Sequence, residues 1–315
     1  MPSQVITTTQ IDHPINIHFQ RMVLTRVLPA FLYQQWGLDY TMAQHEGDIN
    51  KWRRWSNLAD QMAPLTEGED PTPLLLSKTD ITTQLKEYGA LIKTASWRDF
   101  TGLTDDNQQM ANIMLDNMRG TLDSLARDVL DGTASTTTCS NGLPTGTFLN
   151  KADIDTVVTN LEGQNAMKFK STIAASTKIS TSPIRAAYIG IGHKSQRPRL
   201  EAVSGFKHVS SYANQGPILE DEFGATGDVR WLLTTKAPID SNPAPDLYSN
   251  IILAKEFFGI VKIKGNTADG PLVFTPANMT GSGLRRFSLL GWIQNYASRI
   301  LNDNFGHNLK SSIVA

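Results

Sequence analysis

Apolar residues recur every three or four positions between Thr104 and Asp131, which is the spacing of one face of an α-helix. The residues on this face are Met110, Ile113, Met114, Met118, Leu122, Leu125, Val129 and Leu130. Thr104 is a suitable N-cap, and Asp105 and Asp106 place negative charge at the positive helix end. Gly132 is typical of a helix C-terminus. The pattern predicts one helix about 40 Å long, at ~1.5 Å per residue.

A different pattern, the alternation of apolar and polar positions, begins at Ile81. Ile81, Thr83 and Leu85 alternate with polar neighbours, and a second run continues from Tyr88 to Thr94. Alternation with period 2 is typical of β-strands, so two strand-like arms are predicted here.

The stretch before these arms, residues 64–73, is rich in proline and acid. Pro71 and Pro73 exclude a helix. Glu67, Glu69 and Asp70 crowd three carboxylates into four positions, which keeps the stretch in water. We therefore expect an extended excursion that does not pack on its own domain.

The remaining elements are shorter. Apolar residues from Phe19 to Leu32 have helical spacing interrupted by Pro29, after a polar arm at residues 1–18, and Asn150 caps a second short helix. Strand-like runs occupy residues 186–192, 229–235, 250–263 and 271–274. Residues 289–301 fit a helix by periodicity, but a strand buried on both faces has the same composition.

Composition limits the class of protein. The chain of 315 residues can bury a sizeable core, as two domains or as one composite domain. Charged residues make up 19% of it, below the ~25% of ordinary soluble domains, and such a low share is typical of proteins that associate. The formal net charge of -1 provides no global field for a polyanion, so any contact with nucleic acid must be local. Cys139 is the only cysteine, which excludes an intrachain disulfide and CxxC zinc sites and indicates a reducing compartment.

Two segments concentrate positive charge. Residues 47–58 place Lys51, Arg53 and Arg54 among two tryptophans, which suits either a clamp for nucleic acid or a strand with one buried face. Residues 168–207 carry eight basic residues and one acid, and acids follow at 220–228. This arrangement suits internal pairing or contacts between copies of the chain.

A search for chemistry finds no catalytic constellation. The sequence lacks GxxxxGK[ST], HExxH and GxSxG, and its six histidines are scattered. Asp153 and Asp155 could bind a divalent ion but are better explained as acids in the first turn of a helix, and Cys139 has no base nearby in sequence. We expect no enzyme activity, no metal, no cofactor, no membrane span and no secretory signal.

An ordered set of motifs resembles a known family. Residues 47–98 are similar to the signature region of major capsid proteins from tailed double-stranded DNA phages, in the N-four-like podophage branch, through KWRRW (Lys51 to Trp55), PLTEGEDP (Pro64 to Pro71) and KEYGALIKT (Lys86 to Thr94). Further matches are the long helix at 104–131 and the segments at 220–234, 254–265 and 290–302. Residues 283–290 depart from the family, which tends to have an acidic turn with proline there.

The resemblance implies an α+β chain with a Hong Kong 97 type capsid fold. Its parts would be an N-terminal arm and first strand (1–60), an extended β-hairpin loop (61–98), a peripheral domain around a long spine helix (99–183 and 256–315) and an axial domain (184–255). The family favours a strand for the C-terminal run, and we adopt that assignment.

The implied function is a structural protein that assembles into hexamers and pentamers of an icosahedral shell around phage DNA, in a virion assembled in the host cytoplasm. Portal and scaffolding or decoration proteins would be partners. The 50 residues before KWRRW are too few for an internal scaffolding domain of ~100 residues. The alternatives are an encapsulin nanocompartment and a mixed α/β hydrolase. We expect Glu67, Glu69 and Asp70 to pair with Arg53, Arg54 or the basic residues of 168–207 on a neighbouring copy, in that order of preference.

Overall fold

A computed structural model of the chain describes residues 29–65, 67, 68, 70–95, 107–143, 146–170, 185–211, 219, 221–241, 245–263, 272–275 and 286–313. The polar arm, most of the helical pattern that begins at Phe19, the cap at Thr104 and the acid Glu69 lie outside these residues. None of the helices in the described ranges has the length and apolar character needed to cross a membrane.

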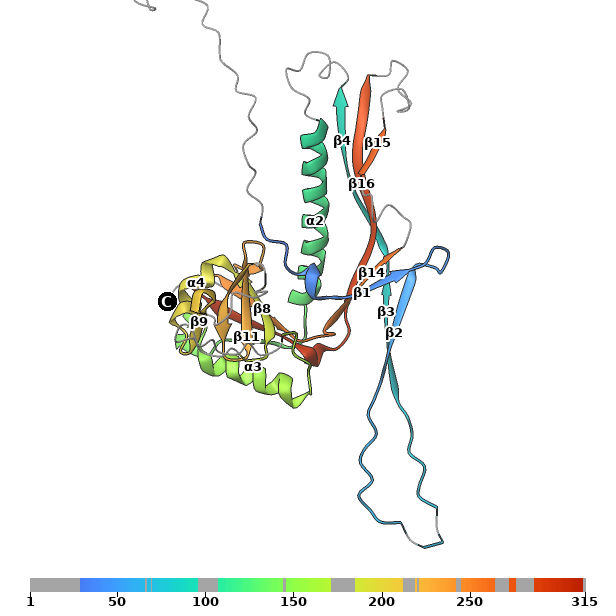
Figure 1. Cartoon of the computed structure of the whole chain (residues 1–315), viewed down its shortest axis with the longest axis vertical. Helices are drawn as coiled ribbons and strands as arrows, with labels where there is room; N and C mark the ends of the chain where they lie inside the picture. Colours follow the sequence, from blue (N-terminus) through green and yellow to red (C-terminus); the bar gives the residue numbers. More distant parts are fainter. Residues whose placement is uncertain are drawn as a thin grey trace, which may run out of the picture.

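The first sheet has a long central strand, β16 (Phe287–Ile300). Its neighbours are β4 (Lys86–Ala95) on one side, and β14 (Phe258–Ile263) and β15 (Leu272–Thr275) on the other, with β1 (Leu38–Met42) parallel to β14 at the edge. β4 pairs with β16 from Lys86 opposite Tyr296 to Ala95 opposite Phe287. The resulting sheet is long and narrow (Figure 1).

Helix α2 (Asn107–Asp131) runs beside β4 and β16 (Figure 1). Met114 packs against Leu290 and Trp292 of β16, and the Trp292 Nε1 donates to Asn117 Oδ1 at 3.0 Å. The helix ends one residue before Gly132, as the sequence predicts. The long predicted helix is therefore confirmed over its described part.

The C-terminal run forms a strand, so the helical periodicity of residues 289–301 is misleading. β16 is bonded to strands on both sides, and much of it is buried. A central strand is apolar at consecutive positions, so matches to helical spacing arise by coincidence. Gly291 lies where a Cβ would stand 2.8 Å from the carbonyl oxygen of Ala90, which shows how closely β4 approaches.

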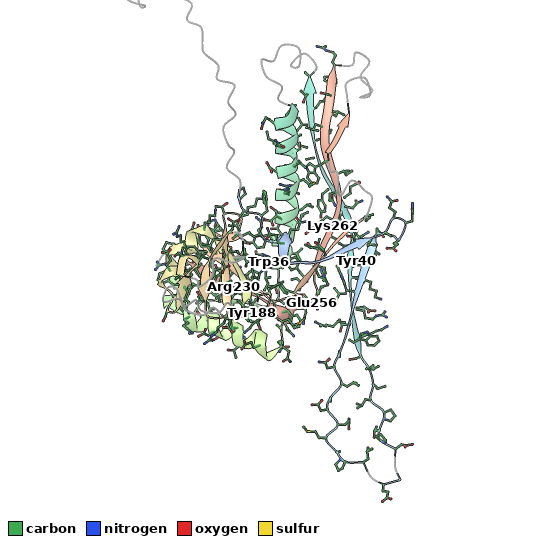
Figure 2. The ribbon with its side chains drawn as sticks, viewed as in Figure 1. Trp36, Tyr40, Tyr188, Arg230, Glu256 and Lys262 are labelled. Carbon is green, nitrogen blue, oxygen red and sulfur yellow. The ribbon has the colours of Figure 1, made fainter. Side chains whose placement is uncertain are left out.

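The second sheet has eight strands. Its order is β5 (Thr136–Thr138), β17 (Gly306–Ser312), β13 (Leu247–Leu253), β8 (Tyr188–His193), β11 (Val229–Thr234), β10 (Glu222–Thr226) and β9 (Phe206–His208), and β12 (Ile239–Asp240) pairs with β13. The strand-like runs predicted at 186–192, 229–235, 250–263 and 271–274 supply β8, β11, β13 with β14, and β15. Tyr188 and Arg230 both lie inside this unit (Figure 2) and are buried.

Helices cover both faces of the second sheet. Helix α3 (Lys151–Gly163) packs Ile154, Val157 and Leu161 on the face that carries Tyr188 and Trp231. Its predicted cap is confirmed, because the Asn150 side chain accepts from Asp153 N. The opposite face receives the C-terminal half of α2 through its buried residues Leu122, Ala126 and Leu130. Short helix α4 (Arg197–Ala202) and hairpin β6–β7 (Asn141–Leu143, Gly146–Phe148) complete the unit.

Chain segments and sheets do not correspond one to one. β5 and β17 are strands of the eight-stranded sheet although they lie outside residues 184–255. A buried polar cluster joins this sheet to α2, since Asp131 Oδ1 accepts from Ser249 Oγ at 2.7 Å and from Asn308 Nδ2 at 2.9 Å. The division into the units 99–183, 184–255 and 256–315 stays a prediction.

Candidate interaction surface

A two-stranded hairpin projects away from both sheets (Figure 1). It consists of β2 (Ile49–Trp55) and β3 (Lys78–Gln84), which pair from Ile49 opposite Gln84 to Trp55 opposite Lys78. The last backbone hydrogen bond of the ladder runs from Ser56 N to Ser77 O at 3.0 Å. We call Ile49–Gln84 the extended hairpin, and residues 57–76 form its distal part.

The base of the extended hairpin is packed on the first sheet. The Trp52 indole lies against Gly259 of β14, where a Cβ would stand 2.7 Å from Trp52 Cζ2. Trp52 borders a small core that contains Met42, Leu85, Val261 and Ala297. Tyr40 of edge strand β1 and Lys262 of β14 lie nearby (Figure 2). The direction of the hairpin is therefore set by packing on the sheet.

An ion-pair cluster lies on one face of the ladder. Opposite residues of an antiparallel pair project to the same face, so Arg53 and Asp80 meet across the strands. Arg53 Nε donates to Asp80 Oδ1 at 2.8 Å, and Lys51 Nζ lies 2.7 Å from Asp80 Oδ2. The hydrogen bond from Arg53, and then that from Lys51, hold the pKa of the Asp80 carboxyl well below its usual range.

The distal part of the extended hairpin exposes large apolar side chains. Leu75 is 92% and Met62 is 90% exposed, and the other exposed apolar residues of this part are Leu58, Leu65, Leu74 and Leu76; Trp55, at the end of β2, is exposed beside it. Single exposed apolar residues are ordinary, but a contiguous group marks an interaction site. Among the described residues, no element of the chain covers these side chains.

The predicted charged residues lie at two ends of this hairpin. Arg53 and Arg54 are in β2, whereas Glu67 and Asp70 lie in the distal part next to Gly68, which adopts φ 83°. Arg54 and both acids are exposed. Within one chain, neither Glu67 nor Asp70 forms an ion pair with these two arginines. Arg53 instead pairs with Asp80.

The basic residues of 168–207 are partly neutralised within the chain. Lys168 Nζ lies 2.6 Å from Asp228 and 2.7 Å from Glu162, and Arg185 lies 3.5 Å from Asp228. Burial opposes the charge on Lys168, but the hydrogen bonds from its two acids raise its pKa overall. Internal pairing therefore accounts for Lys168 and Arg185.

The residues weighed for chemistry are engaged structurally. Burial raises the pKa of the Cys139 thiol far above its ordinary value, which disfavours a nucleophilic thiolate. Asp153 accepts from Ser140 N at 2.8 Å and Ser140 Oγ at 2.7 Å, and Asp155 pairs with Lys151. Among the described residues there is no group of three His, Cys, Asp or Glu placed to hold a metal ion.

Sequence reasoning missed Asp80 and the exposed leucines. The alternation around Ile81 indicates a strand, but the register that places Asp80 opposite Arg53 depends on a turn more than 20 residues long. Leu74, Leu75 and Leu76 follow two prolines, and this apolar run in an otherwise polar excursion is the signal that could have indicated a docking segment.

No protein-family model and no curated protein matches the sequence. Solved structures do: the capsid structure of the cyanophage P-SCSP1u has a TM-score of 0.66 at 11% identity, over 94% of this chain and 92% of that one. The head structure of Helicobacter pylori bacteriophage KHP40 has a TM-score of 0.66 at 11% identity, over 98% and 97%. An encapsulin complex from Synechococcus elongatus has a TM-score of 0.59 at 8% identity, over 93% and 91%. The chain thus has the α+β fold of Hong Kong 97 type capsid proteins over nearly its whole length.

Proposed function

We propose that this chain, which has the Hong Kong 97 type capsid fold, is the structural major capsid protein of a tailed phage and assembles into hexamers and pentamers of an icosahedral shell. The observation that carries the proposal is the extended hairpin. Its base is fixed by Trp52 while its distal part presents apolar side chains to solvent. Covering them with a neighbouring copy contributes about 1.5–3 kcal/mol for each side chain fully buried.

The encapsulin alternative shares the fold, so the likeness to solved structures supports both readings. The motifs KWRRW and PLTEGEDP, which resemble phage proteins, favour the phage reading. No observation favours the hydrolase alternative. Double-stranded DNA inside particles isolated from the natural source is expected, whereas folded cargo protein there would support a nanocompartment.

Arg54 is the preferred partner for the distal acids of a neighbouring copy. Arg53 already shares Asp80 with Lys51, whereas no partner of Arg54 is found in the described part of the chain. Glu67 and Asp70 are exposed and lie far along the hairpin. One exposed pair contributes only ~0.2–1 kcal/mol, but a closed shell repeats it at every subunit. Portal, scaffolding and decoration proteins and local contacts with DNA remain expected partners.

Electron microscopy of the purified chain tests the proposal. Closed isometric shells are expected, and a protein that stays monomeric or dimeric under all assembly conditions would contradict it. Met62→Asp with Leu75→Asp should leave the subunit folded and abolish shells. Gln61→Asp with Ser77→Asp adds the same two negative charges at exposed positions near Met62 and Leu75 in the sequence without removing an apolar group, so it should assemble.

A charge swap tests the Arg54 contact. Glu67→Lys with Asp70→Lys should impair assembly, and adding Arg54→Glu should restore it, because the attraction is then recovered with its sign reversed. Asp60→Lys is the control, since Asp60 is an exposed acid of the hairpin outside the acidic group. Failure of Arg54→Glu to restore assembly would exclude this pairing while leaving the shell proposal intact.

A further inference from the structure

A cavity of about 330 Å³ lies where the extended hairpin leaves the first sheet. β4 pairs with β16 as far as Lys86 opposite Tyr296, and this ladder has no further pair. Beyond this point β3 pairs with β2, whereas β16 continues beside β14 to Ile300. The two strands therefore form a fork. The cavity occupies the fork, because residues of β3, β4 and β16 all line it.

Helix α2 closes the inner side of the cavity. Leu125 and Val129, which are one helical turn apart, line it and are half-buried. The side chains at its rim are polar, and Thr82, Lys86 and Arg299 among them are exposed. The cavity thus has an apolar floor and a polar rim that a solute can reach from solvent.

Positive charge in this cavity is not compensated. Lys86 and Arg299 line it, and no acidic side chain does so among the described residues. Neither of these two cations belongs to an ion pair in the described part of the chain. The larger cavity beside α3, of about 500 Å³, also holds basic residues, but Asp155, Glu162 and Asp228 line it with them. The cavity in the fork is therefore suited to an anion.

The neutral groups of the cavity limit the kind of anion. Three hydroxyl groups, those of Thr82, Thr83 and Ser298, line it together with the two cations. A lysine carries three N–H donors and an arginine five, so donors come from β3, β4 and β16. A flat carboxylate has two oxygens to accept them, whereas a phosphate group has several oxygens that point in different directions. Arginine is also the cation that best matches phosphate geometry.

We propose that the fork between β3 and β16 is a phosphate-binding site, in which Lys86 and Arg299 hold the anion and the hydroxyl groups complete its hydrogen bonds. The phosphate belongs either to a free phosphate ion or to the backbone of DNA, which presents the same chemistry. A site of this kind is the local contact with nucleic acid that a net charge of -1 still permits. The inference does not depend on shell formation, because one subunit contains every group involved.

Phosphorus NMR of inorganic phosphate, titrated into the unassembled full chain, tests the site. Lys86→Gln with Arg299→Gln should weaken binding about tenfold, which corresponds to ~1.4 kcal/mol. Lys194→Gln with Lys255→Gln is the control, because it removes the same charge from exposed positions outside the cavity and should leave binding unchanged. Absence of saturable binding to the unchanged chain, or equal weakening in the two double variants, would overturn the proposal.

Two single variants test the cavity without removing its charge. Thr82→Glu places a carboxylate at the exposed rim and should abolish phosphate binding, whereas Lys86→Arg keeps the charge and should retain it. Phosphate binding that survives in Thr82→Glu would place the anion elsewhere and overturn the proposal. Acetate at the same concentration should not displace the phosphate. Equal displacement by acetate would show a site for carboxylates and would also overturn it.

A short fluorescent DNA duplex identifies the source of the phosphate. If the DNA backbone enters the fork, inorganic phosphate should displace the duplex, and Lys86→Gln with Arg299→Gln should weaken duplex binding as much as phosphate binding. If the double variant loses inorganic phosphate but binds the duplex as the unchanged chain does, the ligand is the free ion. Either result agrees with a phosphate site, and a duplex that binds while inorganic phosphate does not would overturn it. These measurements use the unassembled subunit, so they leave the shell proposal untouched.

Discussion

The indole of Trp52 lies directly on the backbone of Gly259, so close that a Cβ at Gly259 would stand 2.7 Å from Trp52 Cζ2. The contact joins a residue of the extended hairpin to a strand of the first sheet. It places the base of the hairpin against the first sheet through direct packing.

Gly259→Ala should therefore displace Trp52 and loosen the base of the hairpin. Overpacking of this kind costs about 1–3 kcal/mol of unfolding free energy. Chemical denaturation measures the cost, and electron microscopy should show fewer or irregular shells. Gly163→Ala is the control, because a Cβ there meets nothing within 4 Å. Unchanged stability and assembly in Gly259→Ala would refute the positioning role of this contact.

Asp131→Ala should weaken the junction between α2 and the eight-stranded sheet. The variant leaves Ser249 and Asn308 without their shared acceptor, and a buried polar group that loses its partner costs about 1–3 kcal/mol. Denaturant unfolding followed by circular dichroism measures the loss. Asp128→Ala removes an exposed acid from the same helical turn and should cost less than half as much. Equal losses in the two variants would contradict this account.

Asp80→Asn should destabilise the hairpin ladder locally. Because the pKa of Asp80 is lower in the folded chain than the ordinary aspartate value of ~3.9, its ion pairs contribute fully to folding stability above that pH. This contribution is lost only as the pH falls from there through the pKa of the folded state. An NMR titration of the side-chain carboxyl should accordingly show Asp80 still ionised near pH 4. In Asp80→Asn, amide exchange in β2 and β3 should accelerate while that in β8 does not. A carboxyl that titrates in the ordinary range would show that the cluster with Lys51 and Arg53 does not hold in solution.

His307 should make the fold sensitive to mild acid. Burial lowers the pKa of His307, so the unfolded chain binds the proton more readily than the folded chain does. The contribution of His307 to the free energy of unfolding is therefore complete above pH ~6.5, the ordinary histidine pKa. It falls as the pH drops from there toward the pKa of the folded state. His307→Asn should reduce the loss of unfolding free energy between pH 7.5 and 5.5. His193, whose pKa burial also lowers, should account for part of the remainder. The same slope in His307→Asn as in the unchanged protein would count against the assignment.

Local patterns in the sequence predicted the elements that local physics determines. The periodicity from Met110 to Leu130 predicted α2, and the Asn150 cap predicted the start of α3, because both signals arise within a few residues. Alternation around Ile81 predicted the strand of the extended hairpin for the same reason. The acidic stretch after Pro64 indicated an excursion that needs a partner.

Relations between distant segments were beyond such reasoning. The Arg53–Asp80 pair depends on the register of a long hairpin, and the contact of Trp52 with Gly259 joins residues that no periodicity connects. The run in β16 shows the reverse problem, since a strand buried among neighbours on both sides produces helical spacing by coincidence. At these positions the structure was determined by contacts between residues far apart in the sequence, and not by local propensity.

The parallel pairing of β5 with β17 has a consequence for synthesis. Thr137 and His307, which share a hydrogen bond between these strands, are 170 residues apart. At ~5–20 residues per second, β5 leaves the ribosome about 10–30 s before β17 is available. When helix α3 has been made, β5 is the only strand of the eight-stranded sheet that has been synthesised, and a topology so rich in distant contacts folds slowly. The eight-stranded sheet can therefore be completed only after the C-terminal strand β17 has been made.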